Sequence, residues 1–224
     1  MNVLKSCFIL FLIPYLGLCQ YAEYEWEDRD RWMPVDRIFK LVGIERGSMV
    51  ADIGCHEGYL SIHLANRVGN SGKVYAVDVR SDRLDLLKGH IEDREISNVK
   101  VIQGDYDDPK LPKGKLDVVI IMDTYHEMTD YEKILEHVHK ALKPGGKLLI
   151  LEKLKKRARN GSRSEQVDAH TLAPKYVKRE MKAAQFKIIE EVDDLGYWEE
   201  DSDKPMWLLV GQKPKDSKWV KGKI

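Results

Sequence analysis

Short apolar runs alternate with longer amphipathic segments along most of the chain. Five of the runs are rich in branched apolar residues and have the length of buried strands, at about 49–53, 74–78, 99–103, 116–122 and 147–152. The segments between them carry apolar residues at helical spacing, at about 58–68, 82–93 and 129–142. Because strands and helices alternate over short connections, the pattern predicts a doubly wound α/β sheet with parallel strands.

The C-terminal part of the pattern differs from the rest. A helix is expected at about 174–184, followed by strands near 186–193 and 206–212. Only a short excursion joins these two strands, so we expect them to pair in antiparallel fashion. The residues at 214–224 form a basic tail that we expect to fray.

The N-terminus carries one apolar run, from Cys7 to Leu18, which is too short to span a bilayer comfortably. It suits the core of a secretory signal peptide, with Gly17 and Cys19 at the −3 and −1 positions of a cleavage site. We therefore expect a signal peptide at 1–19 and an exported protein, periplasmic or secreted, that contacts a membrane only through this leader. A lipoprotein acylated on Cys19 and a retained apolar segment are the alternatives.

The composition agrees with one domain that has a real core. The chain has 224 residues, of which 43% are apolar and 33% are charged, and its formal net charge is zero. This balance gives no global attraction to nucleic acid or to a membrane, although a local patch could still bind either. Beyond the leader the sequence holds a single cysteine, Cys55, so no internal disulfide is expected there.

A glycine turn between a strand and a helix is the most informative motif. The first strand pattern ends at Asp52, a Gly-x-x-x-Gly turn formed by Gly54 and Gly58 follows, and a helix pattern begins at Tyr59. Glycine lets the backbone approach a ligand closely, and the N–H groups at a helix N-terminus favour anionic groups. A second strand ends in Asp78, where a carboxylate can accept hydrogen bonds from a ribose diol. Together these elements predict a nucleoside-binding βαβ unit.

Several motifs in the same order resemble the class I, seven-stranded S-adenosylmethionine-dependent methyltransferases, over roughly residues 46–212. They are Val50-Ala51-Asp52-Ile53-Gly54 with Gly58 and Tyr59, Val77-Asp78, Gln103-Gly104-Asp105, Leu116 through Asp123, and Leu142-Lys143-Pro144-Gly145-Gly146-Lys147-Leu148. The resemblance implies a Rossmann-like, doubly wound, mostly parallel seven-stranded sheet with an antiparallel C-terminal strand. It divides the chain into the leader, an N-terminal helical extension at 20–45, the methyltransferase domain at 46–213 and the tail.

The resemblance also implies an S-adenosylmethionine site, made of Asp52, Gly54, Cys55, Gly58, Tyr59, Asp78, Val79, Gly104, Asp105, Tyr106 and Asp123. Asp78 would hold the ribose hydroxyls, Asp105 would accept from the adenine amino group beside Tyr106, and Asp123 would face the methyl group. All of them lie at the carboxyl ends of strands, where ligands of open α/β sheets bind. The alternative for each aspartate is a helix N-cap or turn residue.

His56 departs from the family pattern, which often has glycine at this position. Its side chain could point away, could shape the pocket or could weaken cofactor binding. The same residue argues against a nicotinamide dehydrogenase, whose fingerprint needs a glycine two residues after Gly54.

His126, Asp123 and His170 are the candidate catalytic residues. His126 follows the fourth strand and could act as a general base, while His170 follows the fifth strand on the expected acceptor side. Either histidine could instead be an ordinary loop residue. A metal shared by His126, Glu127 and His170 has no ligand-spacing signature, so the sequence predicts no metal.

Two further segments border the expected pocket. The run at 153–163 is basic without an acid, which favours either an anionic substrate or a solvated, mobile loop. The N-terminal aromatic residues Tyr21, Tyr24, Trp26 and Trp32 could close over the site or could only anchor their segment.

The sequence therefore predicts an enzyme that transfers a methyl group from S-adenosylmethionine to a small acceptor, with an anionic acceptor as one option. A non-catalytic nucleoside-binding protein is the first alternative, suggested by His56 and by export away from the cytoplasm, where the cofactor is made. A nucleic-acid methyltransferase is the second, although the typical Asn/Asp-Pro-Pro-Tyr/Phe motif is replaced by Asp123-Thr124-Tyr125-His126. Nucleic acid is thus an unlikely partner, and the oligomeric state is left open.

Overall fold

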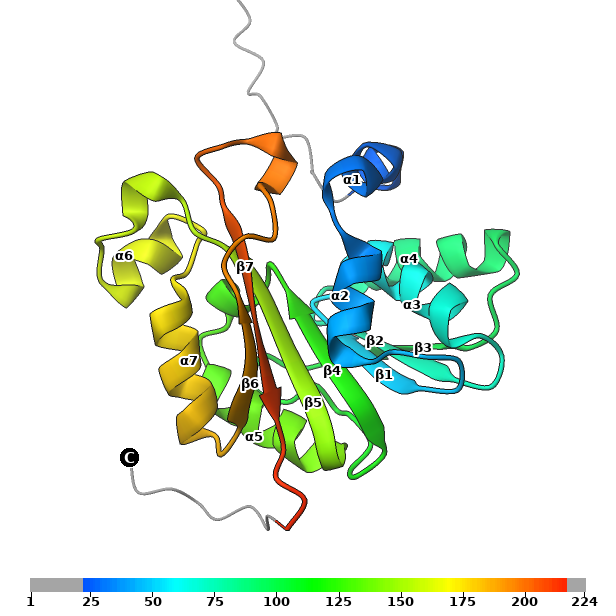
Figure 1. Ribbon diagram of the computed structural model, residues 1–224. Coiled ribbons are helices and arrows are strands. Elements are labelled where there is room, and N and C mark those ends of the chain that lie inside the picture. The colour runs from blue at the N-terminus through cyan, green and yellow to red at the C-terminus, as the bar shows by residue number, and fades with distance from the viewer. Residues whose placement is uncertain (1–21, 217–224) are drawn as a thin grey trace, which may run out of the picture.

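The computed structural model describes residues 22–216, and its centre is a seven-stranded sheet in the order β3-β2-β1-β4-β5-β7-β6 (Figure 1). The strands are β1 Met49–Ile53, β2 Lys73–Asp78, β3 Val99–Gln103, β4 Leu116–Met122, β5 Leu142–Lys153, β6 Lys187–Val192 and β7 Met206–Gln212. Pairing is parallel from β3 through β5, and β7 runs antiparallel to both β5 and β6. The predicted fold class is confirmed.

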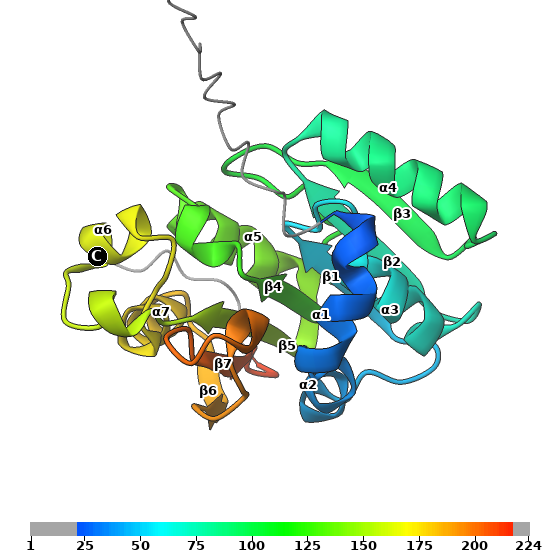
Figure 2. The ribbon, with the colours of Figure 1, turned by 90° about the horizontal axis from the view of Figure 1, so that it is seen from above.

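Helices cover both faces of the sheet because each carries one apolar side. They are α1 Trp26–Trp32, α2 Val35–Val42, α3 Tyr59–Val68, α4 Ser81–Asp93, α5 Tyr131–Ala141, α6 Arg163–Asp168 and α7 Pro174–Ala183, with short 3-10 turns η1 Glu23–Glu25, η2 Tyr125–Glu127, η3 Lys156–Ala158 and η4 Trp198–Glu200. Seen from above, α2 and α3 lie on one side of the sheet, and α5 and α7 lie on the other (Figure 2).

Two main apolar clusters fill the space between the sheet and its helices, one on each face of the sheet. One contains Ile38 and Phe39 of α2 together with Leu64 of α3, which pack on β1 and β4. The other contains Leu135 of α5 and Met181 of α7 on the opposite side. Since the central strands are buried on both faces, their continuous apolar runs are what a parallel sheet requires.

The strand order places a crevice at one end of the sheet. β1 pairs with β2 on one side and with β4 on the other, so the chain reverses its winding direction at β1. Ligands of open α/β sheets bind outside the carboxyl ends of the strands at such a switch point. α1 and η4 contact each other at this end of the sheet (Figure 1).

The basic run that follows β5 is more ordered than the sequence pattern suggests. The basic run at 153–163 contains η3 and leads into α6, which Ser162 and Glu165 cap reciprocally. The expected signal peptide at 1–19 and most of the basic tail lie outside the described residues. Within residues 22–216, no helix is long and apolar enough to cross a membrane.

Candidate functional site

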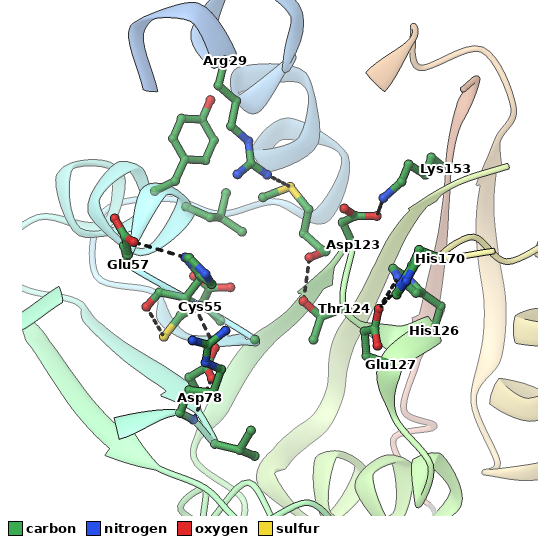
Figure 3. A pocket seen from close by; sticks show the side chains of 18 of the residues that line it. Arg29, Cys55, Glu57, Asp78, Asp123, Thr124, His126, Glu127, Lys153 and His170 are labelled. Atoms are coloured by element: carbon green, nitrogen blue, oxygen red, sulfur yellow. Dashed lines mark hydrogen bonds and ion pairs between the residues drawn. The ribbon is translucent and has the colours of Figure 1, made fainter. Parts of the chain in front are cut away.

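A cavity of about 630 Å³ lies at the carboxyl ends of β1, β2, β4 and β5 (Figure 3). A smaller cavity of about 110 Å³ adjoins it, and the two share six lining residues: Gly54, Asp78, Val79, Tyr106, Thr124 and Glu127. The two cavities together gather all of the predicted cofactor residues, with one exception: Gly58 does not line them and acts through the turn itself.

The glycine turn after β1 depends on the absence of side chains at two positions. Gly54 has a φ of 80°, and a Cβ there would lie 2.3 Å from Cγ2 of Thr124. Gly58 has a φ of 100°, and its Cβ would lie 2.2 Å from Cδ1 of Leu87 on α4. Any other residue would be strained in this left-handed region and would collide with its neighbour. Gly54 therefore presents backbone to the cavity, while Gly58 leaves the room that Leu87 of α4 occupies.

Asp52 is a buried acid at the base of the cavity. Its carboxylate accepts a hydrogen bond from the Ser61 hydroxyl at 2.7 Å, and its residue is 2% exposed. Burial raises the pKa of Asp52 to about 6, while the Ser61 hydrogen bond and the positive charge of Arg29 offset part of this shift. A cationic ligand bound beside Asp52 would lower this pKa again, because it would stabilise the charged carboxylate.

Asp78 at the end of β2 holds the turn that follows β1. One carboxylate oxygen accepts from the backbone N–H of His56 at 2.9 Å, and the other accepts from the backbone N–H of Arg80 at 2.9 Å. His56 adopts a left-handed conformation with a φ of 49°. The histidine thus takes the backbone geometry for which glycine is preferred, and the turn is preserved.

The smaller cavity contains the residues expected near adenine. Gly104, Asp105 and Tyr106 follow β3 and line it. The Asp105 carboxylate is largely exposed and accepts a hydrogen bond from Lys110 Nζ at 2.9 Å, and the Tyr106 side chain is also exposed. A hydrogen bond from an adenine amino group to Asp105 would therefore compete with Lys110.

Asp123 and His126 lie in the main cavity at the end of β4, and each has a buried partner. Asp123 forms an ion pair with Lys153 of β5. Nδ1 of His126 contacts Oε2 of Glu152 at 2.8 Å, and Glu152 also accepts from the backbone N–H of His126 at 3.1 Å. Burial alone would lower the pKa of His126, but the charge and hydrogen bond of Glu152 outweigh it and raise this pKa.

His170 is brought next to His126 from a different part of the chain. Nδ1 of His170 lies 2.6 Å from Oε1 of Glu127, and the same oxygen lies 3.0 Å from Nε2 of His126. Figure 3 shows these three side chains pointing toward one another. Both ring nitrogens of His126 thus face carboxylates, so a role as general base would first require the exposed Glu127 to move.

Cys55 and Tyr59 line the cavity from the glycine turn and the start of α3. The Cys55 thiol is buried, and burial raises its pKa well above the ordinary value, so it is not a reactive thiolate. The Tyr59 hydroxyl donates to Asp30 of α1 at 2.7 Å. Tyr59 therefore ties the N-terminal extension to the cavity wall.

Arg29 of α1 is a site residue that the sequence reading missed. Its residue is 5% exposed, and its guanidinium lies 4.3 Å from the Tyr59 ring centroid and 5.1 Å from that of Trp198. Nη2 also contacts Sδ of Met122 at 3.8 Å (Figure 3). The three-residue spacing of Trp26, Arg29 and Trp32, which places them near one helix face, is the signal that could have indicated it.

Glu57 is a second site residue that the sequence did not indicate, and it holds the N-terminal extension against the domain. Its carboxylate pairs with Nη1 of Arg83 on α4 at 2.6 Å and accepts from the backbone N–H of Glu23 at 3.3 Å. Trp32 of α1 also packs on Trp198, with ring centroids 5.0 Å apart. Trp26 and Trp32 therefore anchor their segment to the domain, and Arg29 between them lines the cavity. Tyr21 lies outside the described residues, and closure of the aromatic side chains over the site stays a prediction.

With this geometry in place, comparison with known proteins identifies the family. A family model described as "Methyltransferase domain" matches residues 44–206, which is most of the chain. The chain therefore belongs to this family, the class I S-adenosylmethionine-dependent methyltransferases. The predicted family, the enzyme class and the family's cofactor, S-adenosylmethionine, are confirmed.

Individual relatives agree with this assignment. A demethylmenaquinone methyltransferase of Geobacillus sp. (strain WCH70) is 31% identical over 113 residues, which cover 50% of this chain and 48% of the relative. The ubiquinone/menaquinone biosynthesis C-methyltransferase UbiE of Azotobacter vinelandii is 33% identical over 114 residues, 50% of this chain and 45% of the relative. The chain thus spans about half the length of the curated relatives it matches.

A solved structure supports the fold. The S-adenosylmethionine-dependent methyltransferase from Aquifex aeolicus superimposes with a TM-score of 0.70 at 22% sequence identity, and the match covers 83% of this chain and 92% of that one.

The same comparisons contradict the predicted export. The relatives carry the names of methyltransferases of menaquinone and ubiquinone biosynthesis, which does not fit an exported enzyme. The expectation of a periplasmic or secreted protein is therefore wrong. Its basis was the length and apolarity of one N-terminal run, and these properties do not by themselves distinguish a secretion signal from other apolar segments.

Proposed function

We propose that this chain transfers a methyl group from S-adenosylmethionine to a small, polar acceptor inside the 630 Å³ cavity. The observation that supports this most strongly is the convergence of Asp52, Asp78 and Asp123, from three different strand ends, on that one cavity. Gly54 presents bare backbone to the cavity, and the cavity volume suits a ligand of nucleoside size. The residues present therefore fit the cofactor of the family.

Each residue of the cofactor side would have a separate task. Asp78 would accept hydrogen bonds from the ribose hydroxyls, while Gly54 and Gly58 keep the backbone close to the methionine part. Asp52 and Arg29 carry opposite charges at the same end of the cavity, so together they suit a zwitterionic amino-acid group. When bound, the cofactor supplies an electrophilic methyl group, and transfer then depends mainly on in-line alignment of the acceptor.

The acceptor would be held on the opposite side of the cavity, where the lining is strongly polar. Asp123, His126, Glu127, Lys153, Lys155, His170 and Lys204 all line this side. Such a wall does not suit the long apolar tail of a lipid-like molecule. Although the matched relatives are named for quinone substrates, we therefore propose a polar acceptor.

An anionic group on the acceptor is supported near Lys155. Burial lowers the pKa of Lys155, and the positive charges of Lys153, Arg157 and Lys204 lower it further. This gathering of positive charge would attract an anion. Lys153 and Lys204 also have acidic partners in Asp123 and Glu199, so the attraction is local to Lys155 and does not extend over the whole cavity.

Calorimetry and turnover together test this function. The full chain is titrated with S-adenosylmethionine, and formation of S-adenosylhomocysteine is then followed by mass spectrometry against a panel of small hydroxy acids, thiols and amines. We expect binding and turnover with at least one polar acceptor. Binding without turnover on any acceptor would instead favour the non-catalytic nucleoside-binding protein. Absence of binding would overturn both readings.

A further inference from the structure

Three potential metal ligands meet at the acceptor side of the cavity. His126 and Glu127 lie in η2 after β4, and His170 lies between α6 and α7, more than forty residues later. One ligand atom from each of the three residues lies within 4.8 Å of the others. Oε1 of Glu127 is 3.0 Å from Nε2 of His126 and 2.6 Å from Nδ1 of His170. The fold thus assembles a cluster that linear spacing does not reveal.

Glu152 supplies the outer carboxylate that commonly orients a metal-binding histidine. It is fully buried, and its carboxylate engages Nδ1 of His126 at 2.8 Å. His126 itself is 3% exposed, so its ring is fixed with Nε2 directed toward Glu127 and the cavity. Metal-binding histidines almost always have their second nitrogen held by such a carboxylate or carbonyl, which orients the ring and makes it a better ligand.

His170 provides a second unusual feature. It is a non-glycine residue in the left-handed region, with a φ of 50°, and its ring centroid lies 6.0 Å from that of His126. Such backbone conformations cost free energy, and they occur often at functional sites, where the surrounding structure maintains them. Here the conformation accompanies the contact of His170 with Glu127.

We propose that Nε2 of His126, a carboxylate oxygen of Glu127 and Nδ1 of His170 bind a divalent transition-metal ion, with zinc as the best match. Two imidazoles and one carboxylate are a common ligand set of catalytic zinc sites, which keep a fourth position open for water or substrate. Metal–ligand bonds of about 2.0–2.2 Å in a tetrahedral site would separate the ligand atoms by about 3.3 Å. Small side-chain movements from the present spacing would reach this geometry.

The carboxylates around the cluster favour a cation, and two nearby lysines partly oppose it. Asp123, Glu127 and Glu152 contribute three carboxylates, and Lys153 neutralises one of them through its pair with Asp123. Lys155 lies further along the same wall and would act against a cation. The two carboxylates that contact His126 directly, Glu127 and Glu152, are therefore the ones expected to dominate locally.

This site would specify the acceptor class, an inference that rests on the proposed methyl transfer. A hydroxyl or thiol group bound at the open position would lose its proton more readily, because zinc lowers the pKa of bound water to about 7 and binds thiols as thiolates. An acceptor with such a donor and an anionic group would fit both the metal and the positive charge near Lys155. The acceptor would then be a hydroxy acid or thiol acid rather than an amine.

Zinc binding can be measured without any acceptor. The full chain is stripped with a chelator, dialysed, and titrated with zinc chloride by calorimetry, and the metal content after desalting is measured by mass spectrometry. We expect one zinc ion per chain, with affinity reduced at least tenfold in His170→Ala and in Glu127→Gln, and about 10–100-fold in Glu152→Gln. His170 and Glu127 are exposed, so their variants should fold, as circular dichroism can verify.

His137→Ala is the matched control, because His137 on α5 pairs with Asp108 and lies outside the cluster. It should bind zinc as the parent does. The proposal is overturned if the parent retains no zinc, or if His170→Ala and Glu127→Gln bind it as tightly as His137→Ala. Titration of the zinc-free parent with S-adenosylmethionine, run alongside, separates failure of the metal site from failure of the proposed function.

Discussion

The carboxylate of Asp78 accepts a hydrogen bond from the backbone N–H of His56 at 2.9 Å, so the end of β2 holds the loop that follows β1. This contact explains how the chain tolerates a histidine where its family often has glycine. The carboxylate stabilises the left-handed backbone of His56, and the loop keeps its shape around the cavity. Under the proposed function Asp78 would thus have two tasks, since it organises the loop and would also accept hydrogen bonds from the ribose.

Replacement of Asp78 should therefore weaken cofactor binding more than the loss of one ligand contact. We expect Asp78→Ala to reduce the affinity for S-adenosylmethionine at least 100-fold, because the proposed ribose contacts and the two hydrogen bonds that support the loop would be lost together. Calorimetry measures the affinity directly. Asp85→Ala is the control, since Asp85 is exposed on α4 and pairs with nearby Lys88. Equal affinities in the two variants would rule out this role for Asp78.

The contact between Gly54 and Thr124 makes a second prediction. Gly54→Ala would place a Cβ 2.3 Å from the Thr124 side chain at a φ of 80°, so we expect destabilisation by about 2–4 kcal/mol and loss of cofactor binding. Gly89→Ala in α4 is the matched control. A Cβ there meets nothing within 4 Å, and this variant should be as stable as the parent or up to about 1 kcal/mol more stable. Urea unfolding provides both values, and similar stabilities for the two variants would contradict the account.

The buried Asp52 predicts an unusual dependence of stability on pH. Its pKa is about 6 in the folded chain and near 3.8 when unfolded, so the folded state binds the extra proton between these values. Stability should therefore fall as pH rises from about 4 to about 6, by roughly 3 kcal/mol from this group. Asp52→Asn should remove that component from the unfolding free energy measured across this range. An unchanged pH profile in Asp52→Asn would show that another group is responsible.

Arg29, in the N-terminal extension, should affect the pKa of Asp52 and therefore the same pH dependence of stability. Its positive charge lowers the pKa of Asp52, so Arg29→Met should raise that pKa above about 6 and move the loss of stability to higher pH. Arg31→Met is the control, because Arg31 lies on the same helix but is exposed and pairs with Asp28. The same unfolding series measures both variants. A shift in Arg31→Met as large as that in Arg29→Met would argue against a specific contact.

The sheet could be predicted from sequence because its signals are local. Continuous apolar runs mark the central strands, and the strand expected at about 116–122 spans Leu116–Met122 in the structure. β5 begins earlier than the expected 147–152, at Leu142, because its first residues pair with Leu116 of β4 across a bulge. That pairing joins distant parts of the chain, so no local pattern encodes it.

The same distinction applies to the site. Asp52, Asp78 and Asp123 could be found because each directly follows a strand pattern, and parallel strands present their carboxyl ends at one edge of the sheet. Glu152 could not, because its importance comes from its contact with His126, which only the folded chain creates. The spacing of Arg29 between two tryptophans was a local signal, but its charge interaction with Asp52 also arises only in the folded chain. His170 and Glu127 were noticed as candidates, but their proximity is likewise a result of the fold.

A crystal structure of the chain with S-adenosylhomocysteine tests the central claim most directly. The account predicts the ligand in the 630 Å³ cavity, with its ribose hydroxyls on the Asp78 carboxylate, its adenine in the smaller cavity beside Tyr106, and its sulfur facing Asp123 and His126. A ligand bound elsewhere, or in this cavity with the ribose remote from Asp78, would contradict it.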